Sequence, residues 1–282
     1  MKGQRQAVIV TLCAHLIPMF FWLGSAVVAL VVMRKGFSKS IAVIIAGGLA
    51  ALFWLSRGSS IEIITLTGVI LMAHILRYSS SWNQTILVVV PLGVFLAWIV
   101  TTFDSGAFAK TALVIQQQTD FSTFSHLLPK DKSMNNTGQI TQVLTIVLLK
   151  AYLLLCLVSM LLALVLARGW QAMLYKPGGF REEICKLRLP FLTSTALLFL
   201  WLSCYFSSSR FLHIVSPCIL LPLLFAGIAL IHGIITIIRP RNAYTLLVIA
   251  YLFTLLFYPA IIILACLDSF IDFRGRLIKK SV

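Results

Sequence analysis

Ionisable residues inside apolar stretches are the places where this sequence could carry chemistry. A charged group in a bilayer is costly and by default marks a ligand, ion or proton site. Glu62, Lys150 and His232 are the three that we single out. Each has a structural alternative. Ser59 and Glu62 have the S-x-x-E spacing of a helix capping box. Lys150 can extend its ammonium group to the membrane surface, and His232 can form a hydrogen bond between helices.

The residue spacings that enzymes use are missing from the sequence. Its five histidines form neither H-E-x-x-H nor an i,i+4 pair, and there is no G-x-S-x-G, C-x-x-C or phosphate-binding glycine pattern. Asp268 and Asp272 can share a helix face, but Arg274 and Arg276 follow closely. This arrangement favours ion pairing over metal binding. We therefore expect no enzymatic activity, no cofactor and no metal site.

The composition predicts a membrane protein. Of 282 residues, 60% are hydrophobic and only 11% are charged, with a mean hydropathy of +1.00, whereas soluble domains are nearer one quarter charged. The net charge of +15 comes from 23 basic and 8 acidic residues. Most bases lie in short connections between apolar runs, where they set topology and contact anionic lipid rather than nucleic acid. We expect an all-α, polytopic transmembrane helix bundle in a single domain, residues 1–282, with the lipid bilayer as its partner.

The apolar runs are long enough to predict about eight or nine membrane segments. Pro18 should kink or split the first run, because proline removes a backbone donor. Pro217 and Pro222 predict a bent or partly re-entrant seventh run. The runs are 7–33, 41–55, 61–76, 85–103, 140–167, 190–206, 212–238 and 244–267.

The distribution of basic residues predicts the topology. The connection 168–189 contains five of them and is therefore placed in the cytoplasm. Alternation then puts the connection 104–139 outside. Within it, Phe121, Phe124, Leu127 and Leu128 have the spacing of a short amphipathic helix that lies on the membrane or closes over a cavity.

The basic C-terminal tail conflicts with simple alternation, because three crossings after residue 189 would leave it outside. Three explanations stay open. The charge rule is broken there, one apolar run is re-entrant, or the run 212–238 crosses twice.

Two surfaces are candidates for protein contact. Ala42, Ala46 and Ala50 fall on one helix face, where small residues let another helix approach, either within this bundle or from a partner. In the connection 168–189, Trp170 and Tyr175 are typical interfacial anchors. Phe180 and Arg181 begin a predicted short helix that Glu182 and Lys186 would stabilise as an i,i+4 pair. This segment is either a structural elbow or a contact surface for a membrane or cytoplasmic protein.

Three motifs carry a family resemblance over essentially the whole chain. They are A-R-G-W-Q-A-M-L-Y-K-P-G-G-F at 167–180 followed by L-R-L at 187–189, L-D-S-F-I-D-F-R at 267–274, and Pro18 before an apolar run into R-K-G at 34–36. The chain resembles the proteobacterial branch of the YybS-like family, bacterial integral membrane proteins whose domain has no assigned function. The resemblance implies a multi-pass protein of the bacterial cytoplasmic (inner) membrane. It assigns no catalytic residue to this chain.

That family is similar in membrane organisation to the S components of energy-coupling-factor transporters. By this analogy we expect a transport-type protein that binds a small molecule in a cavity closed by the outside connection. The alanine face, however, lies in a later helix than the coupling motif of S components. The alternative is a membrane scaffold that recruits a partner through 168–189. A cavity lined by polar and aromatic side chains would favour the first function, and a filled core with an exposed cytoplasmic patch the second.

Overall fold

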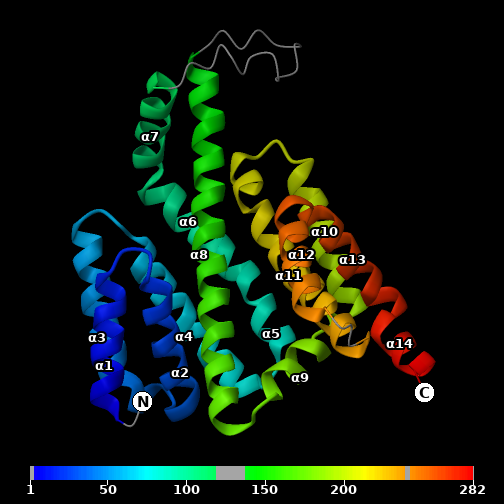
Figure 1. Cartoon of the computed structure of the whole chain (residues 1–282). Coiled ribbons are helices and arrows are strands. Elements are labelled where there is room, and N and C mark those ends of the chain that lie inside the picture. The colour runs from blue at the N-terminus through cyan, green and yellow to red at the C-terminus, as the bar shows by residue number, and fades with distance from the viewer. Residues whose placement is uncertain (1–2, 119–136, 239–241, 282) are drawn as a thin grey trace.

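The computed structural model describes residues 3–118, 137–238 and 242–281, and all regular structure in these ranges is helical (Figure 1). The helices are α1 Gln4–Leu16, α2 Phe21–Lys35, α3 Phe37–Ser56, α4 Ile61–Ser79, α5 Trp82–Leu87, α6 Val89–Phe103, α7 Ser105–Gln118, α8 Thr137–Tyr175, α9 Gly179–Lys186, α10 Phe191–Tyr205, α11 Arg210–Ile238, α12 Ala243–Leu256, α13 Tyr258–Ile271 and α14 Phe273–Ser281. The predicted helical bundle is thus confirmed in its class.

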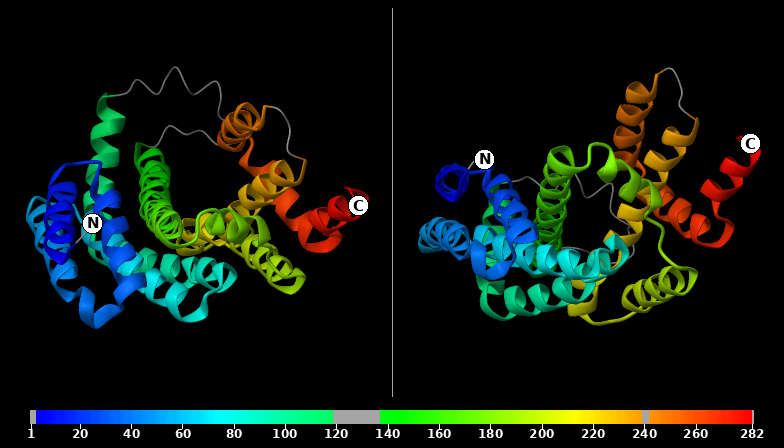
Figure 2. Two further views of the ribbon diagram at one scale, coloured as in Figure 1. Left: turned by 60° about the horizontal axis from the view of Figure 1, so that its bottom comes forward. Right: turned by 90° about the horizontal axis from the view of Figure 1, so that it is seen from below.

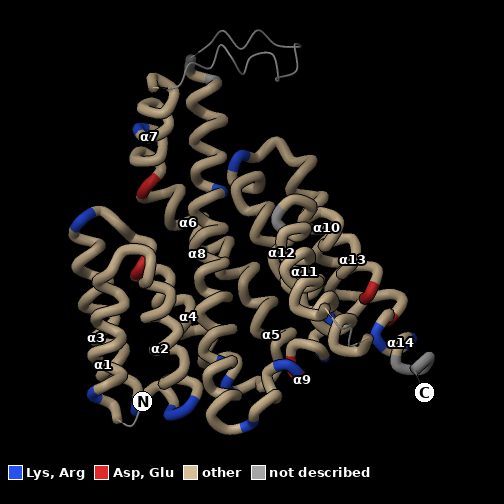
Figure 3. The backbone as a smooth tube through the Cα atoms, viewed as in Figure 1, with Lys and Arg blue, Asp and Glu red and all other residues tan. Residues whose placement is uncertain are grey.

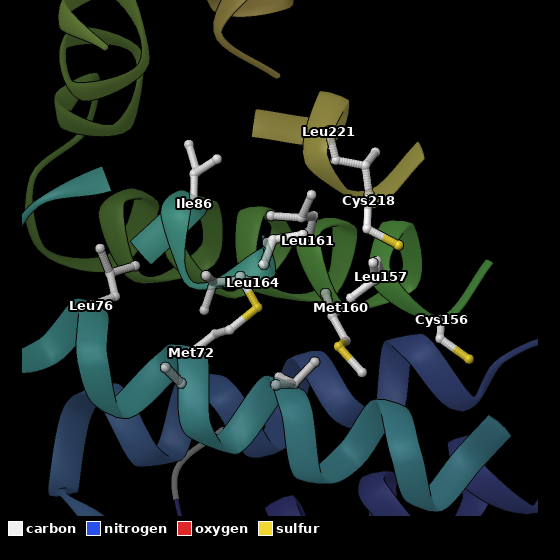
Figure 4. Packing of buried hydrophobic residues seen from close by; sticks show 14 of the residues in the cluster. Met72, Leu76, Ile86, Cys156, Leu157, Met160, Leu161, Leu164, Cys218 and Leu221 are labelled. Atoms are coloured by element: carbon white, nitrogen blue, oxygen red, sulfur yellow. The ribbon is translucent and has the colours of Figure 1, made fainter. Parts of the chain in front are cut away.

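The long helix α8 lies at the centre of the bundle. It packs on α2 and α4 on one side and on α6 and α11 on the other (Figures 1 and 2). Met72 of α4 and Met160 and Leu164 of α8 are fully buried in the resulting core, together with Ile86 of α5 (Figure 4). Lipid is as apolar as these side chains, so close van der Waals packing rather than hydrophobic transfer stabilises such contacts.

The first apolar run is split at Pro18, one of the two predicted outcomes. The chain turns after α1, with Met19 at a φ of 73°, and α2 packs back along α1. His15, at the end of α1, is fully buried. Its Nδ1–H donates to the Thr11 carbonyl at 3.0 Å, and its Nε2 is hydrogen-bonded to the Ser25 hydroxyl at 3.3 Å. These contacts join the two short helices.

Proline breaks two other apolar runs. Pro91 cannot donate to the Leu87 carbonyl four residues before it, and the run 85–103 is divided there into α5 and α6. Pro259 lies in the first turn of α13, and α12 and α13 meet at a bend of 110°.

The run 212–238 is one unbroken helix, so the prediction that it is partly re-entrant is wrong, whereas the predicted bend stays a prediction. Helix α11 is continuous over 29 residues and contains both Pro217 and Pro222. It packs against α6, α8, α9, α10 and α13. Neighbouring helices on several sides can stabilise a proline-containing helix in a membrane protein.

The connection 168–189 is not a loop at its start, because α8 continues to Tyr175. The sequence from 168 to 175 contains no proline, and its one glycine, Gly169, is accommodated within the helix; Pro177 and Gly178 end it. Gly178, with a φ of 85°, precedes α9, close to the predicted short helix. The predicted pair of Glu182 with Lys186 is not the ion pair observed, because Glu182 contacts Lys176 at 3.2 Å instead.

Most of the basic connections lie at one end of the bundle (Figure 3). This end contains α9 and the N-terminus. It also contains the end of α2, with Arg34 and Lys35, and the end of α4, with Arg77. Helix α7 lies at the opposite end, as alternation predicts for the connection 104–139. Because the chain reverses at the bend between α12 and α13, the C-terminal tail returns to the end that contains α9. A re-entrant run is one of the three explanations for the tail, and a bent pair of this kind is either a broken span or a re-entrant run.

Five of the described helical segments are long and apolar enough to cross a membrane, and the number rises to seven if each of two bent pairs is one span. The five are 37–56, 61–79, 82–103, 140–175 and 210–238, and the pairs are α9 with α10 and α12 with α13. A multi-pass membrane protein is consistent with this result. The larger number of eight or nine segments stays a prediction.

Candidate ligand-binding groove

A groove of about 690 Å³ lies between α8, α11 and α12, with α9 at one end. Its volume is within the usual range of small-molecule sites, about 300 to 1,000 Å³. Leu162 of α8 and Tyr244 of α12 form part of its lining and are 51% and 87% exposed, so the groove opens at the side of the bundle. Both α8 and α11 contain segments able to span a membrane. The groove therefore opens where the bilayer would be.

A short chain of polar groups occupies the end of the groove near α9. Arg181 Nε donates to Thr236 Oγ1 at 3.1 Å, and the Thr236 hydroxyl donates to the His232 carbonyl at 2.7 Å. The His232 ring is hydrogen-bonded through Nε2 to the Tyr251 hydroxyl at 2.6 Å. These contacts connect α9, α11 and α12. His232 thus has the interhelical role that was its structural alternative, and it also lines the groove.

Helix α9 is anchored beside the groove by Glu183. Arg168 of α8 donates to both carboxylate oxygens, at 2.6 and 2.9 Å, and the Trp82 indole donates to one of them at 3.1 Å. Helix α9 lies across the end of the bundle, outside the crossing segments (Figure 1). Burial alone would raise the pKa of Glu183, but the hydrogen bonds from Arg168 and Trp82 outweigh it, so the pKa is lowered. Glu183 therefore stays ionised and holds α9 against α8 and α5.

The C-terminal tail anchors α9 from the other side. Arg274 donates to the carbonyls of Cys185 and Leu187 and to Asp268 at 3.2 Å, and both ionised side chains are buried. Arg188 donates to the Asp268 carbonyl at 3.0 Å and forms an ion pair with Asp272 at 3.4 Å. The two tail acids are thus engaged in ion pairs.

Glu62 lies far from this groove, near the other end of the bundle. It is 6% exposed and accepts a hydrogen bond of 2.7 Å from the Ser59 hydroxyl. The pair that the spacing predicted is present, but the capping box is not. Ser60 is the N-cap of α4, without a side-chain capping bond. The Ser60 hydroxyl instead contacts the Tyr152 hydroxyl at 2.7 Å. Glu62 is therefore a buried carboxylate in the first turn of α4 that accepts a hydrogen bond from Ser59, beside the polar contact that Ser60 makes with α8.

Lys150 is half-buried on α8 and forms no ion pair within the part of the chain that the structure describes. It lies in neither of the two sites above. It lies in the half of α8 that begins at Thr137, as a side chain that extends toward the membrane surface requires.

The small-residue face of α3 packs largely inside the bundle. Ala46 and Ala50 are buried, whereas Ala42 is exposed. Gly47, beside them, faces Thr11 of α1 and Leu66 of α4, each close enough that an added Cβ would lie 3.3 Å away. The intrabundle alternative thus accounts for most of this face.

The four candidate contact residues of the connection 168–189, the elbow, have separate environments. Trp170 is half-buried against the core. Tyr175 is exposed, its ring centre lies 4.8 Å from the guanidinium carbon of Arg34, and the Tyr175 hydroxyl accepts a hydrogen bond from that guanidinium. Phe180 packs edge to face on Trp82, with ring centres 6.1 Å apart. Arg181 faces the groove. The elbow therefore makes many contacts within this chain.

A groove between α8, α11 and α12 was not predicted from the sequence. Thr236, Tyr244 and Tyr251 were not singled out, because a threonine and two tyrosines in apolar runs are ordinary and nothing in the sequence relates them to residue 181. The expected lid, residues 121–128, lies outside the described residues. Its connection begins at the opposite end of the bundle from the groove.

The chain matches no protein-family model, no curated protein sequence and no solved structure. Function is therefore argued from the geometry. Within the described ranges, no three His, Cys, Asp or Glu residues are grouped so that they could bind a metal ion.

Proposed function

We propose that this chain is a multi-pass protein of a bacterial cytoplasmic membrane that binds a small, membrane-soluble molecule as a transport-type binding protein. The groove between α8, α11 and α12 is the observation that supports this function. Its lining combines aliphatic walls with a few convergent polar groups, which is the usual construction of a small-molecule site. The resemblance to the YybS-like family and the analogy with S components also belong to this proposal. The groove supports a binding function without them.

The proposal includes nine membrane segments. They are the five long segments, α10, the re-entrant pair of α12 and α13, and α1 and α2 as a short hairpin. Helices of 13 and 15 residues extend about 20 and 22 Å, less than the bilayer core of about 30 Å, so α1 and α2 would enter the membrane tilted or where it is thin. The end that contains α9 is then cytoplasmic, because most of the basic connections lie there.

The scaffold alternative receives less support. Phe180 and Glu183, which a partner-binding elbow would present, contact Trp82 and Arg168 within this chain. The exposed large hydrophobic residues of the elbow are confined to the last turn of α8, at Met173, Leu174 and Tyr175. A patch of this size is common on membrane-interface helices and does not by itself indicate a protein partner.

Native mass spectrometry of the gently solubilised full chain tests the proposal. Leu162→Trp should fill the groove, and Leu155→Trp is the matched control. Both leucines lie on α8, seven residues apart on nearly the same face, and are 51% and 54% exposed, but Leu155 does not line the groove. We expect a stoichiometric small molecule on the wild type and on Leu155→Trp, and its loss from Leu162→Trp. Equal retention by both variants, or a wild type that carries only bulk lipid, would contradict a ligand site in this groove.

A further inference from the structure

The groove changes in chemistry along its length. Toward one end, its walls are aliphatic, with Leu161 and Leu162 of α8 facing Leu221 and Leu224 of α11. Toward α9, the last turns of α11 contribute His232 and Thr236, joined by Arg181, Tyr244 and Tyr251. From Leu221 to Thr236 is 15 residues, or about 22 Å along a helix. A molecule that fills the groove would thus meet hydrocarbon over most of its length and polar groups at one end.

Arg181 supplies the charge at the polar end. Among the described residues that line the groove, none is acidic, and Arg181 forms no ion pair within these residues. The Nε of Arg181 donates to Thr236 Oγ1, and this hydrogen bond orients the guanidinium. The two terminal nitrogens of Arg181 make no hydrogen bond to another described residue. A guanidinium presents paired N–H groups that match the two oxygens of a carboxylate. The unused donors are therefore suited to an anionic group.

The groove is also accessible from the bilayer. Leu162 and Tyr244, on opposite walls, are exposed at the side of the bundle, between helices that contain or adjoin spanning segments. A lipid-soluble molecule could enter sideways with its tail among the aliphatic walls and its head at the interface. A fully polar solute would leave those walls without apolar contact, and a pure hydrocarbon would leave Arg181 without an anion.

We infer that the groove binds a long-chain carboxylate, a molecule of the fatty-acid class, with its carboxylate at Arg181 and its chain along α8 and α11 toward Leu221. This assignment rests on the proposed binding function of the groove and names its ligand class. One guanidinium balances one negative charge, which a single carboxylate provides. The hydroxyls of Tyr244 and Thr236 lie at the same end of the groove as the head group.

The test is a titration of the purified full chain with palmitate, with hexadecanol as the uncharged molecule of equal chain length, and with phosphatidylglycerol as a phosphate-headed lipid. Binding is measured by native mass spectrometry. Arg181→Gln removes the proposed anion contact. Lys186→Gln is its control, because Lys186 is exposed on the same helix, carries the same charge and does not line the groove. Leu162→Trp fills the groove.

We expect wild type to bind palmitate more tightly than hexadecanol or phosphatidylglycerol. Arg181→Gln should weaken palmitate binding about tenfold or more, equivalent to about 1.4 kcal/mol. It should leave hexadecanol binding unchanged, and Lys186→Gln should change neither. Leu162→Trp should weaken binding of both single-chain molecules.

Two failures can be told apart. If Leu162→Trp abolishes binding but Arg181→Gln and Lys186→Gln affect palmitate equally, the groove binds a ligand and the carboxylate assignment is wrong. Phosphatidylglycerol that binds as tightly as palmitate and depends equally on Arg181 also overturns this assignment. If Leu162→Trp changes the binding of no probe, the groove is not the site and the proposed function fails with it.

Discussion

Replacing Arg274 with methionine should destabilise the protein strongly, because it breaks a buried ion pair from one side. The side chains of Arg274 and Asp268 are only 10% and 3% exposed, and their charged atoms lie 3.2 Å apart. The substitution leaves the Asp268 carboxyl buried without its cationic partner, with only the Phe273 amide still donating to its side chain. It also removes the donor to the carbonyls of Cys185 and Leu187. Removing one partner of such a pair costs about 3 to 5 kcal/mol.

Two features place the expected loss at the lower end of this range. Arg274 Nε is buried without a hydrogen-bond partner among the described residues, and deleting it relieves a penalty of about 1 to 3 kcal/mol. The pair also lies at the end of the bundle, where water can solvate a vacated site. We therefore expect a loss of about 3 kcal/mol in the free energy of unfolding.

The assay is equilibrium unfolding in mixed detergent micelles with increasing dodecyl sulfate, followed by circular dichroism. Arg276→Met is the matched control, because Arg276 is exposed on the same helix, and we expect it within about 0.5 kcal/mol of wild type. Adding Asp268→Asn to Arg274→Met should restore part of the stability, since it removes the unpaired charge. Equal losses in Arg274→Met and Arg276→Met would refute the reasoning.

Two further predictions concern the packing of α11 and the anchor of α9. Gly227→Ala should cost about 1 to 3 kcal/mol, because its Cβ would lie 2.6 Å from the Ile261 carbonyl oxygen, whereas Gly48→Ala, with open space around it, should cost nothing in the same unfolding assay. Glu183 has a lowered pKa in the folded state, so its carboxylate adds stability above the unfolded pKa of about 4.3 and loses that contribution as pH falls through the folded value. Wild type should therefore be more stable than Glu183→Gln at pH 7 by about 1 kcal/mol, because the pair is one-third exposed, and this difference should shrink as the pH falls below the unfolded pKa of about 4.3. A difference that is unchanged at pH 3 would show that the ion pair is not the cause.

Local features of the structure followed from the sequence alone. Apolar runs separated by basic connections were sufficient for the helical class, since a bilayer requires every backbone group to be bonded within a helix. Pro18 correctly predicted a break, and Asp268 correctly predicted an ion pair with Arg274, because each depends on residues a few positions away. Asp272 is also ion-paired, but with Arg188, which is distant in the sequence. Pro217 and Pro222 misled the prediction, since neighbouring helices stabilise α11 across both of them.

The tertiary structure alone decided which distant residues meet. Arg181 is 55 residues from Thr236, and His232 is 19 from Tyr251, yet their side chains form one end of a single groove. The bend between α12 and α13 likewise returns the tail to α9. Charge counting showed that the position of the tail conflicts with simple alternation, but it could not resolve the conflict. In an apolar helix nearly every face is suited to burial, so hydrophobic pattern carries little information about which face meets which neighbour. Helix packing supplies that information, and the groove is its consequence.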